Sequence, residues 1–137
     1  MTRFIDMNVA PYLLSSTLEG VLGQRLVRTC CRDCKQAYEP DNETLERIEM
    51  TRDQIGGRPF YFGQGCKICN GTGYKGRKAV VEYLRMSGPL RDLVNQRAPT
   101  LILREKAREL GMRTMREHGI QAILDGYTTV DEVLRYT

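Results

Sequence analysis

The chain has 137 residues, of which 41% are hydrophobic and 28% charged, and its formal net charge is +4. This composition is ordinary for a folded protein and predicts one domain, or one domain with a small added module. The positive excess is modest, with eleven Lys/Arg against eight Asp/Glu after residue 76. It lacks the dense basic stripe of nucleic-acid-binding proteins, so no nucleic-acid partner is expected, although a mildly basic face suits an acidic or phosphate-bearing partner.

No segment is apolar for long enough to cross a membrane, and the first residues lack the basic start and continuous apolar stretch of a signal peptide. We therefore expect a cytoplasmic chain. In that compartment five cysteines favour a metal site or free thiols over disulfides, and the odd count leaves one cysteine outside any fully paired scheme.

Residues 9–29 predict a core helix. Pro11 suits a helix start, and apolar residues recur at spacings of three and four along one predicted face: Leu14, Leu18, Val21, Leu22 and Leu26. Two glycines, Gly20 and Gly23, weaken this helix or let another part of the chain come close.

Residues 30–76 have a different texture, because they hold all five cysteines and seven of the thirteen glycines. So much glycine predicts loops and short hairpins rather than a long helix. Within this stretch we expect one short helix over Asp41–Arg52 and a strand over 59–63.

Residues 77–137 predict a strand followed by helices. The strand is expected over 78–85 and the helices over 89–96, from Thr100 to a stop at Gly111, over 112–125 and over 130–136. Thr129 and Glu132 predict a reciprocal capping box at the start of the last helix. The expected division is thus 1–29, 30–76 and 77–137, in an α+β fold that is mainly helical.

Two Cys-x-x-Cys pairs carry the clearest chemistry: Cys31 with Cys34, and Cys66 with Cys69. Two thiolates separated by two residues fit one tight turn and share one metal, and two such turns complete the tetrahedral shell of zinc. Four thiolates leave no open position for water or substrate, so the predicted zinc site is structural rather than catalytic. The same residues also allow a disulfide or redox thiols, or unconnected core cysteines. Cys30 is the spare, interpreted as a partly buried free thiol.

Two other stretches resemble known sites without completing them, and two single residues, His118 and Arg77, are further candidates. The segment from Gly71 to Lys78 resembles a phosphate-binding P-loop, but Arg77 stands where that motif needs Lys and no Ser/Thr follows. The stretch from Cys66 to Gly73 matches one Cys-x-x-Cys-x-Gly-x-Gly unit of the DnaJ-type chaperones, which carry several copies. His118, the single histidine, predicts a surface or cap position. Arg77 follows a glycine-rich turn, a setting that suits either a phosphate or carboxylate partner or a plain surface ion pair.

Nearly the whole chain, in order, resembles the C-terminal part of the type II secretion ATPases (general secretion pathway protein E) and the type IV pilus assembly ATPases. The residues that carry this resemblance fall in Ile5–Leu13, Gly20–Arg28, the two cysteine pairs with Gly65 and Asn70, Gly73–Arg77, Glu82–Leu84, Gly111–Glu117 and Gly126–Arg135. Two departures are Cys30, where the family usually has an apolar residue, and Arg32, where Pro is common.

The resemblance implies a fragment. It would hold the end of a RecA-like ATPase core, an inserted tetracysteine zinc module and a C-terminal helical bundle. The parent would be a hexameric cytoplasmic ATPase, peripheral to the inner membrane, that uses ATP and Mg²⁺, contacts neighbouring subunits and inner-membrane platform proteins, and powers type II secretion or type IV pilus assembly. The Walker motifs precede the region seen here, so this chain alone is expected to be inactive. Arg77 would lie near nucleotide at a subunit boundary.

Two functions from other classes stay open at this point. One is a self-standing zinc chaperone or adaptor related in shape to the DnaJ unit, and the other is a thiol oxidoreductase. Aggregation suppression by the isolated chain would support the first. Rapid disulfide reduction without bound metal would support the second.

Overall fold

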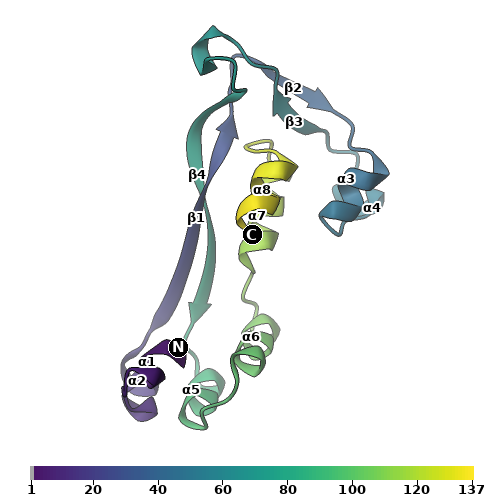
Figure 1. Ribbon diagram of the computed structural model, residues 1–137. Helices are drawn as coiled ribbons and strands as arrows, with labels where there is room; N and C mark the ends of the chain where they lie inside the picture. The colour runs from purple at the N-terminus through teal and green to yellow at the C-terminus, as the bar shows by residue number, and fades with distance from the viewer. Residues whose placement is uncertain (1) are drawn as a thin grey trace. The chain divides into compact units, whose positions relative to one another are not determined.

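A computed structural model describes residues 2–137 (Figure 1). It mixes α-helices with two small sheets, in agreement with the α+β class. The RecA-like core and the zinc module stay predictions. In chain order the elements are α1 Thr2–Asp6, α2 Pro11–Thr17, β1 Gly20–Cys30, β2 Lys35–Tyr38, α3 Asn42–Arg47, α4 Arg52–Ile55, β3 Phe60–Gly63, the 3-10 turn η1 Lys67–Cys69, β4 Tyr74–Arg85, α5 Gly88–Asn95, α6 Thr100–Glu109, α7 Met115–Leu124 and α8 Val130–Tyr136.

The chain forms two compact units, each built from two separate stretches. Unit 1 contains the residues up to Gly23 together with Glu82–Thr114, and unit 2 contains Gln24–Val81 together with Met115–Thr137. Because these units group segments by contact and not by role, the division into 1–29, 30–76 and 77–137 stays a prediction. None of the helices formed by residues 2–137 has the length and apolar character needed to span a membrane.

The predicted helix over 9–29 is wrong in its second half. The helix α2 ends at Thr17, and Gly20–Cys30 is the strand β1, which pairs with β4. The partner strand lies more than forty residues away in the sequence, so its hydrogen bonds cannot be read from local spacing. Gly20 shows why a glycine stands there, because a Cβ at this position would lie 2.8 Å from the Tyr83 ring and 3.0 Å from the Leu84 carbonyl oxygen.

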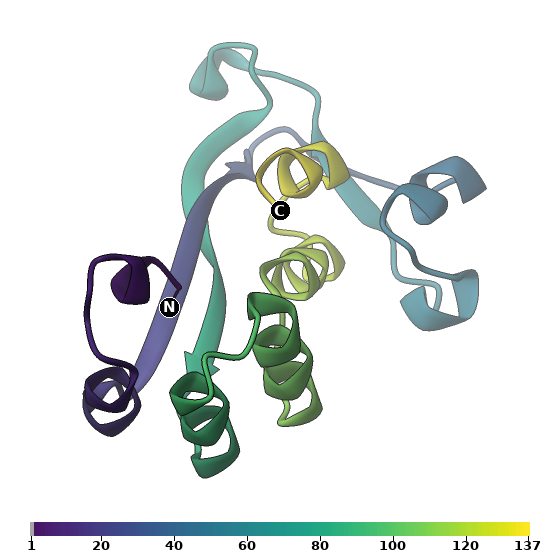
Figure 2. The same ribbon diagram turned by 60° about the horizontal axis from the view of Figure 1, so that its bottom comes forward.

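Unit 1 has its own apolar core, made by α2, α5, α6 and the end of β4. Figure 2 shows α5 beside α2 and α6. The buried members are Leu14, Met86, Leu90, Val94, Leu103 and Ala107. The Ser15 hydroxyl donates a hydrogen bond to Oδ1 of Asn95 at 2.7 Å, and the Arg91 guanidinium lies 3.2 Å from the Glu19 carboxylate. These contacts join α2 and the residues directly after it to α5.

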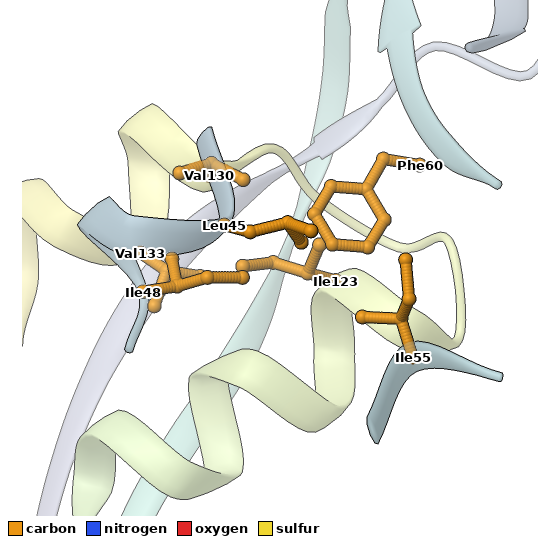
Figure 3. Packing of buried hydrophobic residues seen from close by; sticks show 7 residues of the cluster. All are labelled: Leu45, Ile48, Ile55, Phe60, Ile123, Val130 and Val133. Atoms are coloured by element: carbon orange, nitrogen blue, oxygen red, sulfur yellow. The ribbon is translucent and has the colours of Figure 1, made fainter. Parts of the chain in front are cut away.

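Unit 2 buries a second core between the segment 42–63 and the last two helices. Figure 3 shows side chains from α3, α4 and β3 meeting those of α7 and α8, namely Leu45, Ile48, Ile55, Phe60, Ile123, Val130 and Val133. The strands β2 and β3 pair antiparallel, with Lys35 opposite Gly63 and Tyr38 opposite Phe60. Instead of one helix over Asp41–Arg52 there are two, because Glu49 adopts the left-handed backbone conformation at φ 57° between them.

The helices after residue 87 agree closely with the sequence prediction, except that α7 begins at Met115 rather than 112. The predicted capping box at α8 forms only in part. The Thr129 hydroxyl accepts the Glu132 N–H at 3.3 Å. The Glu132 side chain does not return the bond, because its carboxylate binds Arg28 instead.

Candidate metal centre

Two turns at the ends of neighbouring strands carry the paired cysteines. Cys31 and Cys34 occupy the turn between β1 and β2, whereas Cys66 directly precedes the 3-10 turn η1 and Cys69 is its last residue. Three of the four are buried and Cys66 is partly exposed. The fold therefore brings together all four sequence-predicted ligands, although the pairs lie more than thirty residues apart.

The four sulfur atoms form a compact cluster, all within 4.8 Å of one another. The Sγ–Sγ distance is 3.9 Å from Cys31 to Cys66, 3.8 Å from Cys34 to Cys69 and 3.6 Å from Cys66 to Cys69. A disulfide needs about 2.05 Å, so these are separate thiols. A regular tetrahedron of thiolates at about 2.3 Å from a central zinc has edges of about 3.8 Å. The cluster fits a tetrahedral ion of that size and could hold a metal ion.

Backbone N–H groups point at two of the sulfurs. Cys69 Sγ accepts from the N–H of Cys66 at 3.1 Å and of Gly73 at 3.3 Å, and Cys34 Sγ accepts from Gly65 N–H at 3.3 Å. Such donors favour the thiolate, which is the form that binds metal. The cluster thus supplies the sulfur ligands, and the neighbouring backbone N–H groups help to keep two of them as charged thiolates.

The pKa values of the thiols reflect two opposing effects. Burial acts to raise the pKa of Cys69, but the N–H groups of Cys66 and Gly73 outweigh it and lower the value to about 6. Burial raises the pKa of Cys34 to about 12 and also raises that of Cys31. A metal cation supplies the positive charge that buried thiolates need, and binding it releases their protons.

Close backbone contact holds the second turn against β3. A Cβ on Gly63 would lie 2.0 Å from the carbonyl oxygen of Gly73, so no larger residue fits there. That same Gly73 carbonyl accepts the N–H of Cys31 at 2.8 Å. Gly73 therefore touches both halves of the cluster. The glycine-rich sequence predicted a sharp turn here but not this contact.

The remaining candidates lie outside the cluster. Cys30 is 5% exposed, and its thiol faces the Tyr61 carbonyl oxygen at 3.8 Å. Arg77 is exposed near the start of β4. His118 is partly buried, and its Nδ1 accepts the Val81 N–H at 3.0 Å, so it supports the edge of β4 instead of lying free on the surface.

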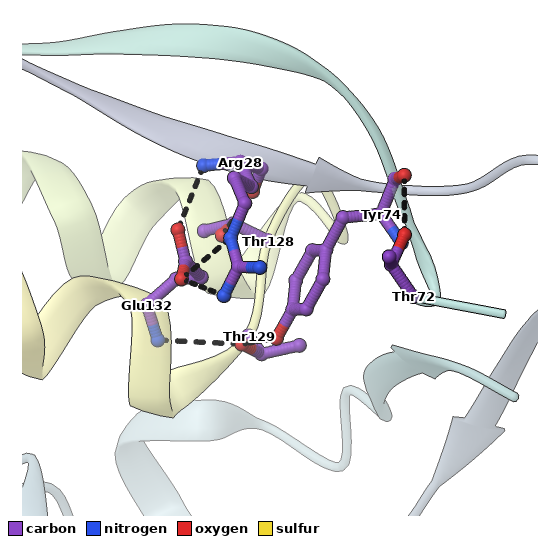
Figure 4. A network of polar contacts seen from close by, with 6 residues as sticks. All are labelled: Arg28, Thr72, Tyr74, Thr128, Thr129 and Glu132. Atoms are coloured by element: carbon purple, nitrogen blue, oxygen red, sulfur yellow. Dashed lines mark hydrogen bonds and ion pairs between the residues drawn. The ribbon is translucent and has the colours of Figure 1, made fainter. Parts of the chain in front are cut away.

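Sequence reasoning missed a polar network beside the cluster (Figure 4). Glu132 is 2% exposed and accepts hydrogen bonds from the backbone N–H and the Nε of Arg28, each at 2.9 Å. Burial acts to raise the pKa of the Glu132 carboxyl, but hydrogen bonds from Arg28 outweigh it and leave the value below its usual range. The signal that could have found it is a Glu at the third position of α8 with an Arg in a facing strand, a pairing that local patterns cannot distinguish from a capping box.

The same network reaches the cysteine turn. The Tyr74 hydroxyl lies 2.8 Å from Oγ1 of Thr129, and the Arg28 guanidinium lies 4.1 Å from the centre of the Tyr74 ring. Thr72 donates to the Cys69 carbonyl at 2.7 Å and accepts the Tyr74 N–H at 3.3 Å. A continuous set of contacts therefore joins the second cysteine pair to the first turn of α8.

Comparison with known sequences matches residues 1–135 to the family described as "Type II/IV secretion system protein". The chain belongs to this family. Its relatives include the type IV pilus assembly ATPase PilB of Thermus thermophilus, 43% identical, and the type II secretion system protein E of Xanthomonas campestris pv. campestris, 42% identical. The type II secretion system ATPase E of Vibrio cholerae is 37% identical.

Each comparison with these three relatives covers 100% of the chain. The chain in turn covers 15% of the Thermus protein, 24% of the Xanthomonas protein and 27% of the Vibrio protein. It therefore corresponds to a minor part of each of these three relatives.

Proposed function

We propose that this chain is the C-terminal zinc-binding domain of a cytoplasmic ATPase that powers type II protein secretion or type IV pilus assembly. The observation that carries the proposal is the family match over residues 1–135, together with the four-sulfur cluster inside the matched region. In the parent protein, ATP and Mg²⁺ would be bound by residues outside this chain, since these 137 residues contain no Gly-Lys pair of a P-loop.

Zinc is the proposed ion, held by Cys31, Cys34, Cys66 and Cys69. The donor set supports this choice, because four thiolates at tetrahedral spacing are typical of structural zinc. With all four positions taken by protein, zinc would supply no reaction step. It would hold two loops together, and such sites contribute on the order of 10–16 kcal/mol in small zinc peptides.

The proposed role in the parent is to support the ATPase core and to present a surface to other proteins. The partners would be neighbouring subunits of a hexamer and the inner-membrane platform proteins, which would place the domain at the cytoplasmic face of that membrane. Arg77, exposed near the start of β4, is the proposed contact to nucleotide or to the next subunit.

Zinc content and folding test the metal site directly. The purified chain should contain one zinc per chain by elemental analysis. A strong chelator should remove the metal and weaken the circular dichroism signal of the chain, because unit 2 would lose structure. Cys66→Ser should lose zinc. The matched control is Cys30→Ser, because Cys30 is a buried cysteine next to the cluster that takes no part in it. Equal zinc in the wild type and Cys66→Ser would overturn the assignment.

The functional half needs the full-length ATPase. Cys66→Ser there should reduce secretion or pilus assembly, whereas Cys30→Ser should leave it near the wild-type level. The isolated chain should not hydrolyse ATP, and hydrolysis abolished by Cys66→Ser would contradict the proposal. Suppression of protein aggregation by the isolated chain, without any effect of Cys66→Ser in the parent, would favour a chaperone or adaptor.

A further inference from the structure

A basic groove lies beside the cysteine cluster in unit 2. It has a volume of about 710 Å³ and lies between the end of β1, the start of β4 and the turn from α7 to α8. Two carboxylates, Asp33 and Asp125, lie in its wall. Five cationic side chains line it: Arg32, Lys35, Lys75, Arg77 and Lys78. The balance of charge makes it attractive to anions.

Three of these cations are free to bind a partner. The ammonium groups of Lys35 and Lys78 each lie 4.0 Å from the centre of a tyrosine ring, so both already have a favourable contact. Arg32, Lys75 and Arg77 are exposed, and within residues 2–137 no carboxylate forms an ion pair with any of them. Such an unneutralised set is a site for several separate negative charges.

The walls favour a peptide with spaced carboxylates over a compact phosphate group. Asp33 and Asp125 would repel a dense polyanion, and the cations come from three separate segments of the chain instead of converging on one backbone turn. A segment whose acidic side chains are several residues apart can meet Arg32 and Lys75 and still avoid the two wall carboxylates.

The chain itself carries one such acidic segment, at residues 39–49. Glu39 is paired with Arg52, and Asp41 caps α3 through the Thr44 N–H at 2.8 Å. The side chains left over are Glu43, Glu46 and Glu49, all exposed and, among the residues that the structure describes, without an ion pair. Glu43 and Glu46 are three positions apart on α3, so they lie on one side of the helix.

Within one chain this segment lies outside the groove, because none of residues 39–49 lines it. The hairpin of β2 and β3 leads from the cysteine cluster to α3, which lies at its far end (Figure 1). Its paired length is three residue steps of about 3.3 Å, or roughly 10 Å. The acidic segment and the basic groove are thus different patches on one unit, which is the arrangement that gives head-to-tail contacts between identical subunits.

We infer that the basic groove receives the acidic α3 segment of a second copy of this chain, with Arg32 and Lys75 facing Glu43 and Glu46. The inference rests on the proposed function in one respect, because a ring of identical subunits would bring these two patches together. It names the partner of the subunit-contact surface. The attraction is between exposed groups, so it should weaken as salt shortens the Debye length from about 30 Å at 0.01 M to about 8 Å at 0.15 M.

Charge reversal on each patch gives a decisive test. One zinc-loaded variant carries Arg32→Glu and Lys75→Glu, and the other carries Glu43→Lys and Glu46→Lys. Sedimentation velocity at low salt should show the wild type associating beyond its 15.7 kDa monomer, with at least tenfold weaker self-association for each variant alone. An equimolar mixture of the two variants should associate again, because each groove then meets an α3 of opposite charge.

The matched control reverses two cations that lie outside the groove, Arg25→Glu and Lys67→Glu, and changes net charge equally. It should associate like the wild type. Three results would overturn the inference: a monomeric wild type at low salt, a mixture that stays monomeric, or a control that loses association as strongly as the groove variant. All variants should keep one zinc, so failure here is distinguishable from failure of the metal assignment.

Discussion

Replacing Glu132 by Ala should be among the most damaging single changes outside the cysteines. The carboxylate is 2% exposed and accepts bonds from the backbone N–H and the guanidinium of Arg28. Breaking a buried ion pair costs about 3–5 kcal/mol. The Arg28 side chain is 44% exposed and can turn to water, so we expect the lower end, about 3 kcal/mol of unfolding free energy.

Urea unfolding of the zinc-loaded protein, followed by circular dichroism, measures this loss as a shift in midpoint. Asp131→Ala is the matched control. Asp131 precedes Glu132 on α8, and its carboxylate lies 2.7 Å from Arg47, but the two side chains are 76% and 46% exposed. That pair should contribute less than about 1 kcal/mol. Equal losses for the two variants would refute the claim that burial makes the Glu132 pair important.

The pH dependence gives a second check on the same carboxyl. Because hydrogen bonds from Arg28 hold the folded-state pKa of the Glu132 carboxyl below its ordinary value, its stabilising effect is present in full above the unfolded pKa and is lost as pH falls through the folded pKa. The stability difference between the wild type and Glu132→Gln should therefore be constant at neutral pH and shrink below about pH 4.5. Taking the difference removes the loss of zinc that both proteins share.

Three further outcomes follow from single contacts. Gly63→Ala should lower the free energy of unfolding by at least about 3 kcal/mol and release the metal, because its Cβ would collide with the Gly73 carbonyl. Gly71→Ala, at φ 76° in open space, should lower it by only about 1 kcal/mol. Equal zinc affinities of these two variants would contradict the reasoning. His118→Ala should lower the free energy of unfolding by about 1 kcal/mol and speed hydrogen exchange at the Val81 amide, whose N–H the imidazole ring accepts. Unchanged exchange at that amide would count against the hydrogen bond. Tyr74→Phe should cost about 1 kcal/mol in urea unfolding and keep full zinc content, because only the hydroxyl contact to α8 is lost.

The sequence alone was sufficient to predict the cluster of four cysteines, because two short Cys-x-x-Cys turns limit how the thiols can be arranged. It also predicted most helices after residue 87, where caps, glycines and apolar spacing agree. These features are local, and each depends on residues within a few positions of one another.

The prediction for the segment after Gly20 was wrong because the structure there depends on residues far away in the sequence. Leu14 and Leu18 belong to the core of unit 1, as a helical stripe predicts, but Val21, Leu22 and Leu26 are 40%, 59% and 48% exposed. The spacings of three and four that run from Leu14 to Leu26 imitate a helix, whereas the hydrogen bonds that fix the strand come from β4, far along the sequence. The Arg28–Glu132 pair joins residues that are 104 positions apart, so local sequence patterns could not predict it either.

The discontinuous construction of unit 2 has a consequence for the order of folding during synthesis. The four cysteines all lie between residues 31 and 69, so the metal site has its full set of ligands while α7 and α8 are still unmade. The core around Phe60 cannot form as early, because Ile123, Val130 and Val133 are part of it and are synthesised later. Until then its apolar face has nothing to cover it, and exposed faces of this kind are prone to aggregate. Early capture of zinc on the ribosome would hold the β2–β3 hairpin in its final shape through that interval, so zinc supply would govern the yield of soluble protein as well as its final stability.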